Sequence, residues 1–218
     1  MKLMKKDMGG AAHVLGLGKA IMRAGLKVHL RILVPAVENS VSDKAMRPLD
    51  IVTARNNKTI EIGNTDAEGR VILADALTYA CEEKTEFVID FATLTGAARV
   101  ALGTELPALF SNDDRLAQDL ADASSKTADP MWRLPLWQSY RSAMDGKTAD
   151  LSNESSMPYA GAITAALFLQ EFINKDIAWA HLDVMGWNVA SKPGRPEGGE
   201  AMGLRAVFEM IKNRYSSK

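Results

Sequence analysis

The sequence predicts a three-layer α/β/α sandwich with a largely parallel mixed sheet. Apolar β-rich runs alternate with segments in which apolar residues recur at helical spacing, a pattern typical of helices that cover both faces of a sheet. Hydrophobic residues make up 47% of the chain and charged residues 24%, so the sequence is able to bury a core. The length of 218 residues, without a repeat or a linker, predicts one domain over residues 1–218.

The period of the apolar residues and the turn signals between them predict each element in turn. Gly25 ends the first helix, and residues 56–58 form the turn of a hairpin. In chain order we expect a helix over 8–24, a buried strand over 28–37, a polar loop over 38–50, hairpin strands over 51–55 and 59–62, a helix over 67–83, a strand over 87–91, a loop and helix over 93–102, a strand over 106–110, helices over 113–125 and 136–144, an irregular stretch over 149–161, a helix over 162–174, a strand over 177–184 and a helix over 201–214.

Charge, cysteine content and hydropathy restrict the class of protein. The net charge of −1 provides no overall attraction to nucleic acid or to an anionic membrane, so we expect neither as a partner. Cys81 is the only cysteine, which excludes an internal disulfide and fits a cytoplasmic location. No apolar run approaches the roughly 20 residues of a membrane helix, and the N-terminus lacks the apolar core of a signal peptide.

The most informative segment is Asn-Thr-Asp-Ala-Glu-Gly-Arg at residues 64–70, between a predicted strand and a predicted helix. Asp66 and Glu68 offer hard oxygen ligands for a divalent cation, and the planar guanidinium of Arg70 suits an anion beside it. In the alternative interpretation, Asp66 caps the helix, Glu68 lies in its first turn and Arg70 is solvated. Spacing alone favours the alternative, because helix caps far outnumber metal sites.

Two further segments carry candidate residues. Asp7 precedes Gly9 and Gly10, a pair that is costly inside a helix and indicates close backbone approach; the alternative is that Asp7 caps the helix. Residues 90–98 run from a strand into Thr and Gly residues before a helix, and such a loop presents backbone groups to a ligand. An ordinary turn with threonine caps explains this loop equally well.

The chain resembles the leucyl (cytosol) aminopeptidase family over nearly its whole length. The family's seven-residue signature is intact at 64–70, Met-x-x-Asp-Met-Gly-Gly-Ala-Ala appears at 4–12, and Ala-Thr-Leu-Thr-Gly-Ala appears at 92–97. Further likeness lies at 132–136, 161–165 and 179–183, in the same order as in the family. The resemblance outweighs the cap interpretations of Asp7, Asp66 and Glu68, and it implies a zinc-peptidase-like α/β fold.

The resemblance also implies an activity. Members of the family release N-terminal residues from peptides with two divalent metal ions that activate water. Carried over by motif, Asp7, Asp66 and Glu68 are metal ligands, Glu68 bridges the metals, and Arg70 holds a bicarbonate ion that serves as the general base. The metals implied are Mn²⁺ or Zn²⁺, with Mg²⁺ also compatible with oxygen ligands. The substrate-binding residues implied are Met4, Asn64, Thr93, Leu94 and Gly96, and Met185 is expected to shape the pocket for the first residue.

The family pattern includes an earlier segment, with a lysine and an aspartate that bind metal and a second lysine that stabilises the tetrahedral intermediate. The chain starts after that segment, so we expect residues 1–218 to be an incomplete C-terminal catalytic domain that is inactive or nearly so alone. The family assembles as homo-hexamers and some members bind DNA. The alternative function is therefore a non-catalytic module for oligomerisation or DNA binding.

The histidines are not expected to bind metal. His181 lies in an apolar strand, where a core or supporting role is more common than ligation beside carboxylates. His13 and His29 show no pattern that indicates a function.

Overall fold

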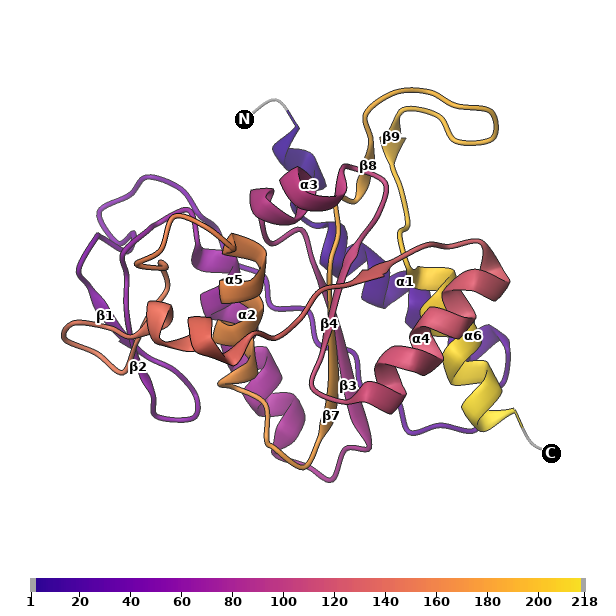
Figure 1. Ribbon diagram of the computed structural model, residues 1–218, viewed down its shortest axis with the longest axis horizontal. Helices are drawn as coiled ribbons and strands as arrows, with labels where there is room; N and C mark the ends of the chain where they lie inside the picture. Colours follow the sequence, from indigo (N-terminus) through magenta and orange to yellow (C-terminus); the bar gives the residue numbers. More distant parts are fainter. Residues whose placement is uncertain (1–2, 217–218) are drawn as a thin grey trace. The chain divides into compact units, whose positions relative to one another are not determined.

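A computed structural model describes residues 3–216 and divides them into two compact units (Figure 1). The first unit contains residues 3–34, Ile89–Leu134 and 179–216, and the second contains Pro35–Val88 and Pro135–Ala178. Each unit is therefore assembled from segments that are distant in the sequence.

The first unit is built on a four-stranded sheet of order β3-β7-β4-β5. Strand β4 is antiparallel to β7, with Ala108 opposite Asp183, and parallel to β5. Helix α6 packs against α4 and α1, and Figure 1 shows α4 and α6 side by side. The elements are η1 (Met4–Lys6), α1 (Gly9–Arg23), β3 (Phe87–Ala92), α3 (Gly96–Leu102), β4 (Ala108–Ser111), α4 (Asp114–Thr127), β5 (Trp132–Arg133), β7 (Ala178–Asp183), β8 (Trp187–Asn188), β9 (Gly198–Gly199) and α6 (Leu204–Tyr215).

The second unit joins a small sheet to two packed helices. Strand β2 is antiparallel to β1 and parallel to β6, and Asn57 has φ 68° in the hairpin turn between β1 and β2. Helix α5 is buried along most of its length and packs against α2 and η2. The elements are β1 (Ile51–Thr53), β2 (Thr59–Glu61), α2 (Glu68–Cys81), η2 (Gln138–Met144), β6 (Leu151–Ser152) and α5 (Gly161–Gln170).

The mixed α/β class is confirmed, and the sheets contain both parallel and antiparallel pairs. The long helices lie where the apolar period predicts them. Helix α4 is typical: the Asp113 side chain accepts a hydrogen bond from Leu116 N at 2.6 Å, and the apolar stripe that includes Leu120 is buried. Among residues 3–216, no helix combines the length and apolar character needed to cross a bilayer.

The predicted strand over residues 28–37 is wrong, since no residue of this segment belongs to a strand. Ile32 packs against a helix instead of a sheet, since a Cβ placed on Gly18 of α1 would clash with its side chain, whereas Val34 and Val37 are exposed. The segment over 136–144 forms a 3₁₀ rather than an α-helix. Strands β5, β6, β8 and β9 have two residues each, which is too short to leave a periodic signal.

Candidate functional site

Three segments of the first unit meet closely at the start of helix α1. A Cβ on Gly9 would lie 2.9 Å from Thr93 Cγ2, and a Cβ on Gly10 would clash with the carbonyl oxygen of Phe91. Gly186, with φ +66°, would place a Cβ 3.3 Å from the same Thr93 atom. The close backbone approach predicted from the Gly-Gly pair is confirmed, and it joins the η1–α1 junction to the loops after β3 and β7.

Asp7 lies at this meeting point with its carboxylate exposed. Thr93 Oγ1 donates a hydrogen bond to Asp7 Oδ1 at 2.7 Å. The residue at the N-cap of α1 is Met8, without a side-chain cap, so the interpretation of Asp7 as a cap is wrong. The structure thus brings together two of the residues that the sequence nominates, from segments 86 positions apart.

The loop that carries Thr93 is held by Asp183, which is 3% exposed. The Asp183 carboxylate accepts hydrogen bonds from Leu94 N at 3.0 Å, from Thr95 N at 3.1 Å and from Thr95 Oγ1 at 2.6 Å. Burial raises the pKa of the Asp183 carboxyl, although the charge of His181 and the hydrogen bonds from Thr95 act against burial. Thr95 also caps α3 by accepting from Ala98 N at 3.0 Å, so the threonine cap is present in this loop.

A buried polar network joins Asp90 of β3 to Trp179 and His181 of β7. The Asp90 carboxylate contacts Trp179 Nε1 at 2.7 Å and His181 Nδ1 at 2.6 Å. The His181 ring stacks on Phe110 and Trp179, which confirms its place in the core. Burial by itself lowers the pKa of His181, but the charge and hydrogen bond of Asp90, together with the charge of Asp183, outweigh burial, and the net pKa is raised.

The other nominated residues of the first unit lie on the same three segments as Asp7, Thr93 and Gly186. Met4 and Gly96 are exposed, whereas Leu94 and Met185 are half-buried. Close to Asp7, burial followed by the charge of Arg99 lowers the pKa of Lys6. The Lys5 ammonium lies 5.1 Å from the centroid of the Trp187 ring.

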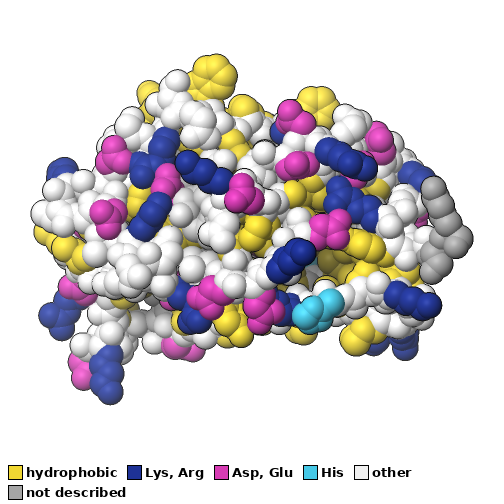
Figure 2. Space-filling model, turned by 90° about the horizontal axis from the view of Figure 1, so that it is seen from below, with side chains coloured by type: hydrophobic (Ala, Val, Ile, Leu, Met, Phe, Trp, Pro, Cys, Tyr) yellow, Lys and Arg dark blue, Asp and Glu magenta, His cyan; other side chains and the backbone are white. Residues whose placement is uncertain are grey.

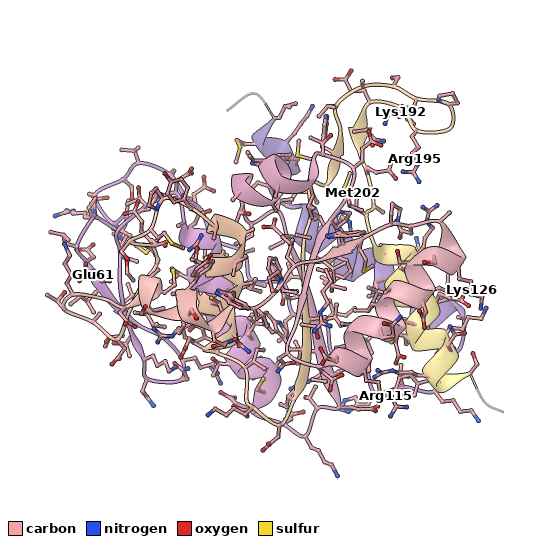
Figure 3. All side chains as sticks on the ribbon, in the orientation of Figure 1. Glu61, Arg115, Lys126, Lys192, Arg195 and Met202 are labelled. Atoms are coloured by element: carbon pink, nitrogen blue, oxygen red, sulfur yellow. The ribbon has the colours of Figure 1, made fainter. Side chains whose placement is uncertain are left out.

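His13 has a structural role that its sequence context does not indicate. Its Nδ1 lies 2.6 Å from Gly9 O, and its Nε2 accepts from Met202 N at 2.8 Å, which assigns the proton to Nδ1. Burial lowers the pKa of His13. The residue ties α1 to the segment before α6, where Figure 3 labels Met202.

In the second unit, the signature residues 64–70 connect β2 to α2. Asp66 is exposed, and its backbone N–H donates to Asn64 Oδ1 at 2.9 Å. Ala67 is the N-cap of α2 and provides no side-chain cap, so the interpretation of Asp66 as a cap is wrong. Glu68 is the first residue of α2, a position that the helix dipole favours for a carboxylate.

Arg70 is not a solvated side chain, as the alternative interpretation required. It is half-buried in the first turn of α2, and its guanidinium carbon lies 6.0 Å from the centroid of the Phe168 ring on α5. Packing against an aromatic ring restricts the orientation of the guanidinium plane.

Sequence reasoning missed Asn153, which is 0% exposed and holds the loop before α2. Its Oδ1 accepts from Gly63 N at 2.8 Å and from Asn64 N at 3.1 Å. Its Nδ2 donates to Asn64 O at 2.7 Å and to Ala67 O at 3.3 Å. The only signal is an asparagine in an irregular polar stretch, and no periodic pattern identifies it.

The nominated acidic residues belong to different units: Asp7 to the first, and Asp66 and Glu68 to the second. Within either unit, over the residues that the structure describes, no three His, Cys, Asp or Glu side chains form a group able to hold a metal ion.

A mixed α/β protein that presents a carboxylate on the loop between a strand and a helix has the arrangement with which many α/β proteins bind ligands. The model of the cytosol aminopeptidase family, catalytic domain, matches residues 1–208, and the chain therefore belongs to this family. The family resemblance drawn from the sequence motifs is thereby confirmed.

Individual relatives agree with the family assignment. The chain is 60% identical to a cytosol aminopeptidase from Coxiella burnetii, with a TM-score of 0.96 over 99% of this chain and 47% of that one. The bottromycin maturation enzyme BotP, solved in complex with Mn, is 39% identical, with a TM-score of 0.90 over 95% of this chain and 47% of that one. A probable cytosol aminopeptidase from Prochlorococcus marinus (strain MIT 9215) is 46% identical, and the match covers 98% of this chain and 44% of that protein. The chain thus spans less than half the length of these relatives.

Proposed function

We propose that this chain forms the C-terminal metal-binding part of an aminopeptidase that releases N-terminal residues from peptides. The observation that carries the proposal is the exposed Asp66 carboxylate on a loop whose backbone is held from below by Asn153. A rigid loop that presents a carboxylate to solvent is suited to binding a ligand, whereas a helix cap would point the carboxylate at the backbone.

We propose that carboxylates of this chain help to hold two divalent metal ions. Asp7 and Asp66 have exposed carboxylates, and Asp7 keeps its Oδ2 available while Thr93 binds Oδ1. We assign Asp7, Asp66 and Glu68 as ligands, with Glu68 bridging the two ions. Oxygen ligands suit Mn²⁺, Mg²⁺ and Zn²⁺, and the relative BotP was solved with Mn. Divalent ions in such a site lower the pKa of water and polarise a peptide carbonyl.

Arg70 is the proposed catalytic residue of this chain. Its planar guanidinium offers paired N–H donors to an anion, and its packing near Phe168 orients them. We assign Arg70 as the binding residue for a bicarbonate ion that serves as general base. Peptide substrates would contact Met4, Asn64, Thr93, Leu94, Gly96 and Met185.

The remaining assignments follow from the family. The resemblance places further ligands and a lysine outside residues 1–218, so we propose that the chain alone is inactive or nearly so. We also propose a homo-hexamer for the larger protein, as the family resemblance implies. We propose a cytoplasmic location, in line with the names of the relatives. A DNA-binding role is not favoured, because the net charge is −1 and provides no overall attraction to nucleic acid. On the face shown in Figure 2, basic and acidic side chains are interspersed.

A chimera that joins this chain to the remainder of the Coxiella burnetii relative tests the proposal. We expect the chimera, but not the chain alone, to hydrolyse leucine amide in the presence of Mn²⁺. Asp7→Asn, Asp66→Asn and Glu68→Gln should each abolish activity and weaken Mn²⁺ binding. Their effects on binding should be less than additive, because the three residues share one site. The control is Asp176→Asn, which alters an exposed carboxylate of the second unit.

Two results would contradict the proposal. Hydrolysis by the unextended chain at the rate of the chimera would refute the inactivity of the chain. Full Mn²⁺ binding by the Asp7→Asn and Asp66→Asn variants would refute the ligand set.

A further inference from the structure

The side chain of Asn153 makes four hydrogen bonds to the backbone of the loop between β2 and α2, from a position about ninety residues away in the sequence. The loop contains residues 62–67 and leads directly into Glu68. Asn153 follows β6, which pairs in parallel with β2, and its backbone N–H donates to Glu61 O at 3.0 Å. The strand pairing therefore delivers the Asn153 side chain to the underside of the loop.

The Asn153 amide uses its full hydrogen-bonding capacity on this loop. Its oxygen has two lone pairs and accepts from two backbone N–H groups, those of Gly63 and Asn64. Its nitrogen has two protons and donates to two backbone carbonyls, those of Asn64 and Ala67. Only one orientation of the amide satisfies two donors and two acceptors, so the partners also assign the orientation.

Backbone hydrogen bonds hold the two ends of this loop: Leu49 N donates to Ile62 O, Ile62 N donates to Asp50 O, and Ala67 N donates to Asn64 O. The turn is closed locally by Asp66 N on Asn64 Oδ1, and the exposed Asn39 donates to Thr65 O at 3.2 Å. The N-cap residue Ala67 provides no side-chain hydrogen bond to the first turn of α2. Asn153 donates instead to the carbonyl oxygen of Ala67, the N-cap residue itself, and so holds the last residue before the helix.

We propose that Asn153 is a positioning residue that holds the backbone of residues 63–67 so that Asp66 and Glu68 present their carboxylates for metal binding. The inference rests on the proposed function of these carboxylates. Aspartate lacks the two donors that Asn64 O and Ala67 O require, and alanine lacks all four contacts. Residues that orient metal ligands commonly change metal affinity about 10–100-fold when they are replaced.

The test uses the 218-residue chain with Mn²⁺ as the probe, at concentrations up to the millimolar range. Backbone amide exchange at Gly63 and Asn64 reports the loop, and paramagnetic broadening of the resonances of residues 64–68 reports Mn²⁺ binding. Asn153→Ala should accelerate exchange at both amides and weaken Mn²⁺ binding by about tenfold or more. Asn153→Ser is a milder change and replaces the alanine variant if that variant fails to fold. It should accelerate exchange and weaken Mn²⁺ binding in the same direction but by less.

The matched control is Glu61→Gln, at a position labelled in Figure 3. Glu61 is buried in the same unit and accepts from Thr148 N at 3.1 Å and from Thr148 Oγ1 at 2.5 Å, but its side chain does not bind the loop. Glu61→Gln should lower the stability of the unit without changing Mn²⁺ affinity. If Asn153 had a purely structural role, Asn153→Ala and Glu61→Gln would weaken Mn²⁺ binding equally whenever they lower the stability of the unit equally.

The outcomes separate the inference from the function on which it rests. Faster exchange in Asn153→Ala with unchanged Mn²⁺ affinity would overturn the positioning role and leave the proposed ligands standing. An equal loss of affinity in Glu61→Gln would overturn it as well. Absence of Mn²⁺ broadening at residues 64–68 in the unsubstituted chain would overturn the proposed function together with this inference.

Discussion

Two loops carry the proposed site residues, and the two units hold them in different ways. In the first unit, the loop of Thr93, Leu94 and Thr95 is bound by a buried carboxylate, Asp183, whose contacts are all with donors. In the second, residues 63–67 are bound by a buried amide, Asn153, which contacts donors and acceptors equally. A carboxylate makes stronger hydrogen bonds, but its burial is costly and its charge depends on pH. The amide is neutral, so the second loop should be insensitive to pH.

Removing the charged anchor should have the largest effect. Asp183→Ala leaves the backbone N–H groups of Leu94 and Thr95 without their acceptor, and we expect a loss of about 3–5 kcal/mol in the free energy of unfolding. Urea denaturation measures the loss. Asp113→Ala, which removes the N-cap of α4, should cost only about 1 kcal/mol. If the two variants were equally stable, Asp183 would not be the main anchor of its loop.

The first loop also depends on a close backbone approach, which gives the second prediction. A Cβ at Gly10 would clash with the carbonyl oxygen of Phe91, just before the loop, and backbone yields less readily than a side chain. Gly10→Ala should therefore lower the free energy of unfolding by about 1–3 kcal/mol, as measured by thermal or urea unfolding.

Gly16→Ala in the same helix is the control for Gly10→Ala. Its Cβ would meet only the terminal Cδ1 of Leu204, at 3.2 Å, which has room to turn. The gain in helix propensity, about 1 kcal/mol, should keep this variant as stable as the parent chain. Equal destabilisation by both substitutions would indicate that the Phe91 carbonyl does not limit the space at Gly10.

The smallest expected effect concerns pH and the buried network that joins Asp90 to His181. Asp90 raises the pKa of His181, so the imidazolium that it stabilises contributes stability that is fully present below the ordinary histidine pKa of about 6.5. This stability is lost as the pH rises through the raised pKa of the folded state. Asp90→Asn should lower the free energy of unfolding by about 2 kcal/mol at acidic pH. The loss is limited because His181 is able to release its proton.

Unfolding free energies of the parent chain and the Asp90→Asn variant, measured at several pH values, check this prediction. The difference between the two should shrink on the alkaline side of the transition. The contribution of Asn153, measured with Asn153→Ala over the same range, should stay constant. A pH-dependent contribution from Asn153 would remove the contrast between a charged and a neutral anchor.

The sequence predicted most of the fold because helices and strands leave a local period. Residues 8–24 and 201–214 follow this rule, and α1 and α6 lie there. The segment over 28–37 has the composition of a buried strand, yet composition does not report whether a partner strand is adjacent. The apolar pattern of the sequence therefore gave a wrong prediction at this segment, because the pairing of strands, and not the propensity of the residues, decides whether a strand forms.

The candidate site likewise contains some features that the sequence predicted and others that it did not. The Gly-Gly pair predicted close approach, since a glycine is required wherever a side chain would clash, and Asp7 and Thr93 were nominated separately. The sequence did not indicate that Thr93 would bind Asp7, or that Asp183 and Asn153 would hold the two loops. These contacts join positions about ninety residues apart, and a single buried polar residue leaves no repeating pattern.

The sequence by itself determined the family, the alternation of helices and strands and the acidic residues proposed as ligands, because each depends on neighbouring residues along the chain. Only the tertiary structure decided which buried groups anchor those residues. Hydrogen-bond partners for a loop come from whichever segment the packing of the strands places beneath it, and that choice has no local physical cause in the sequence.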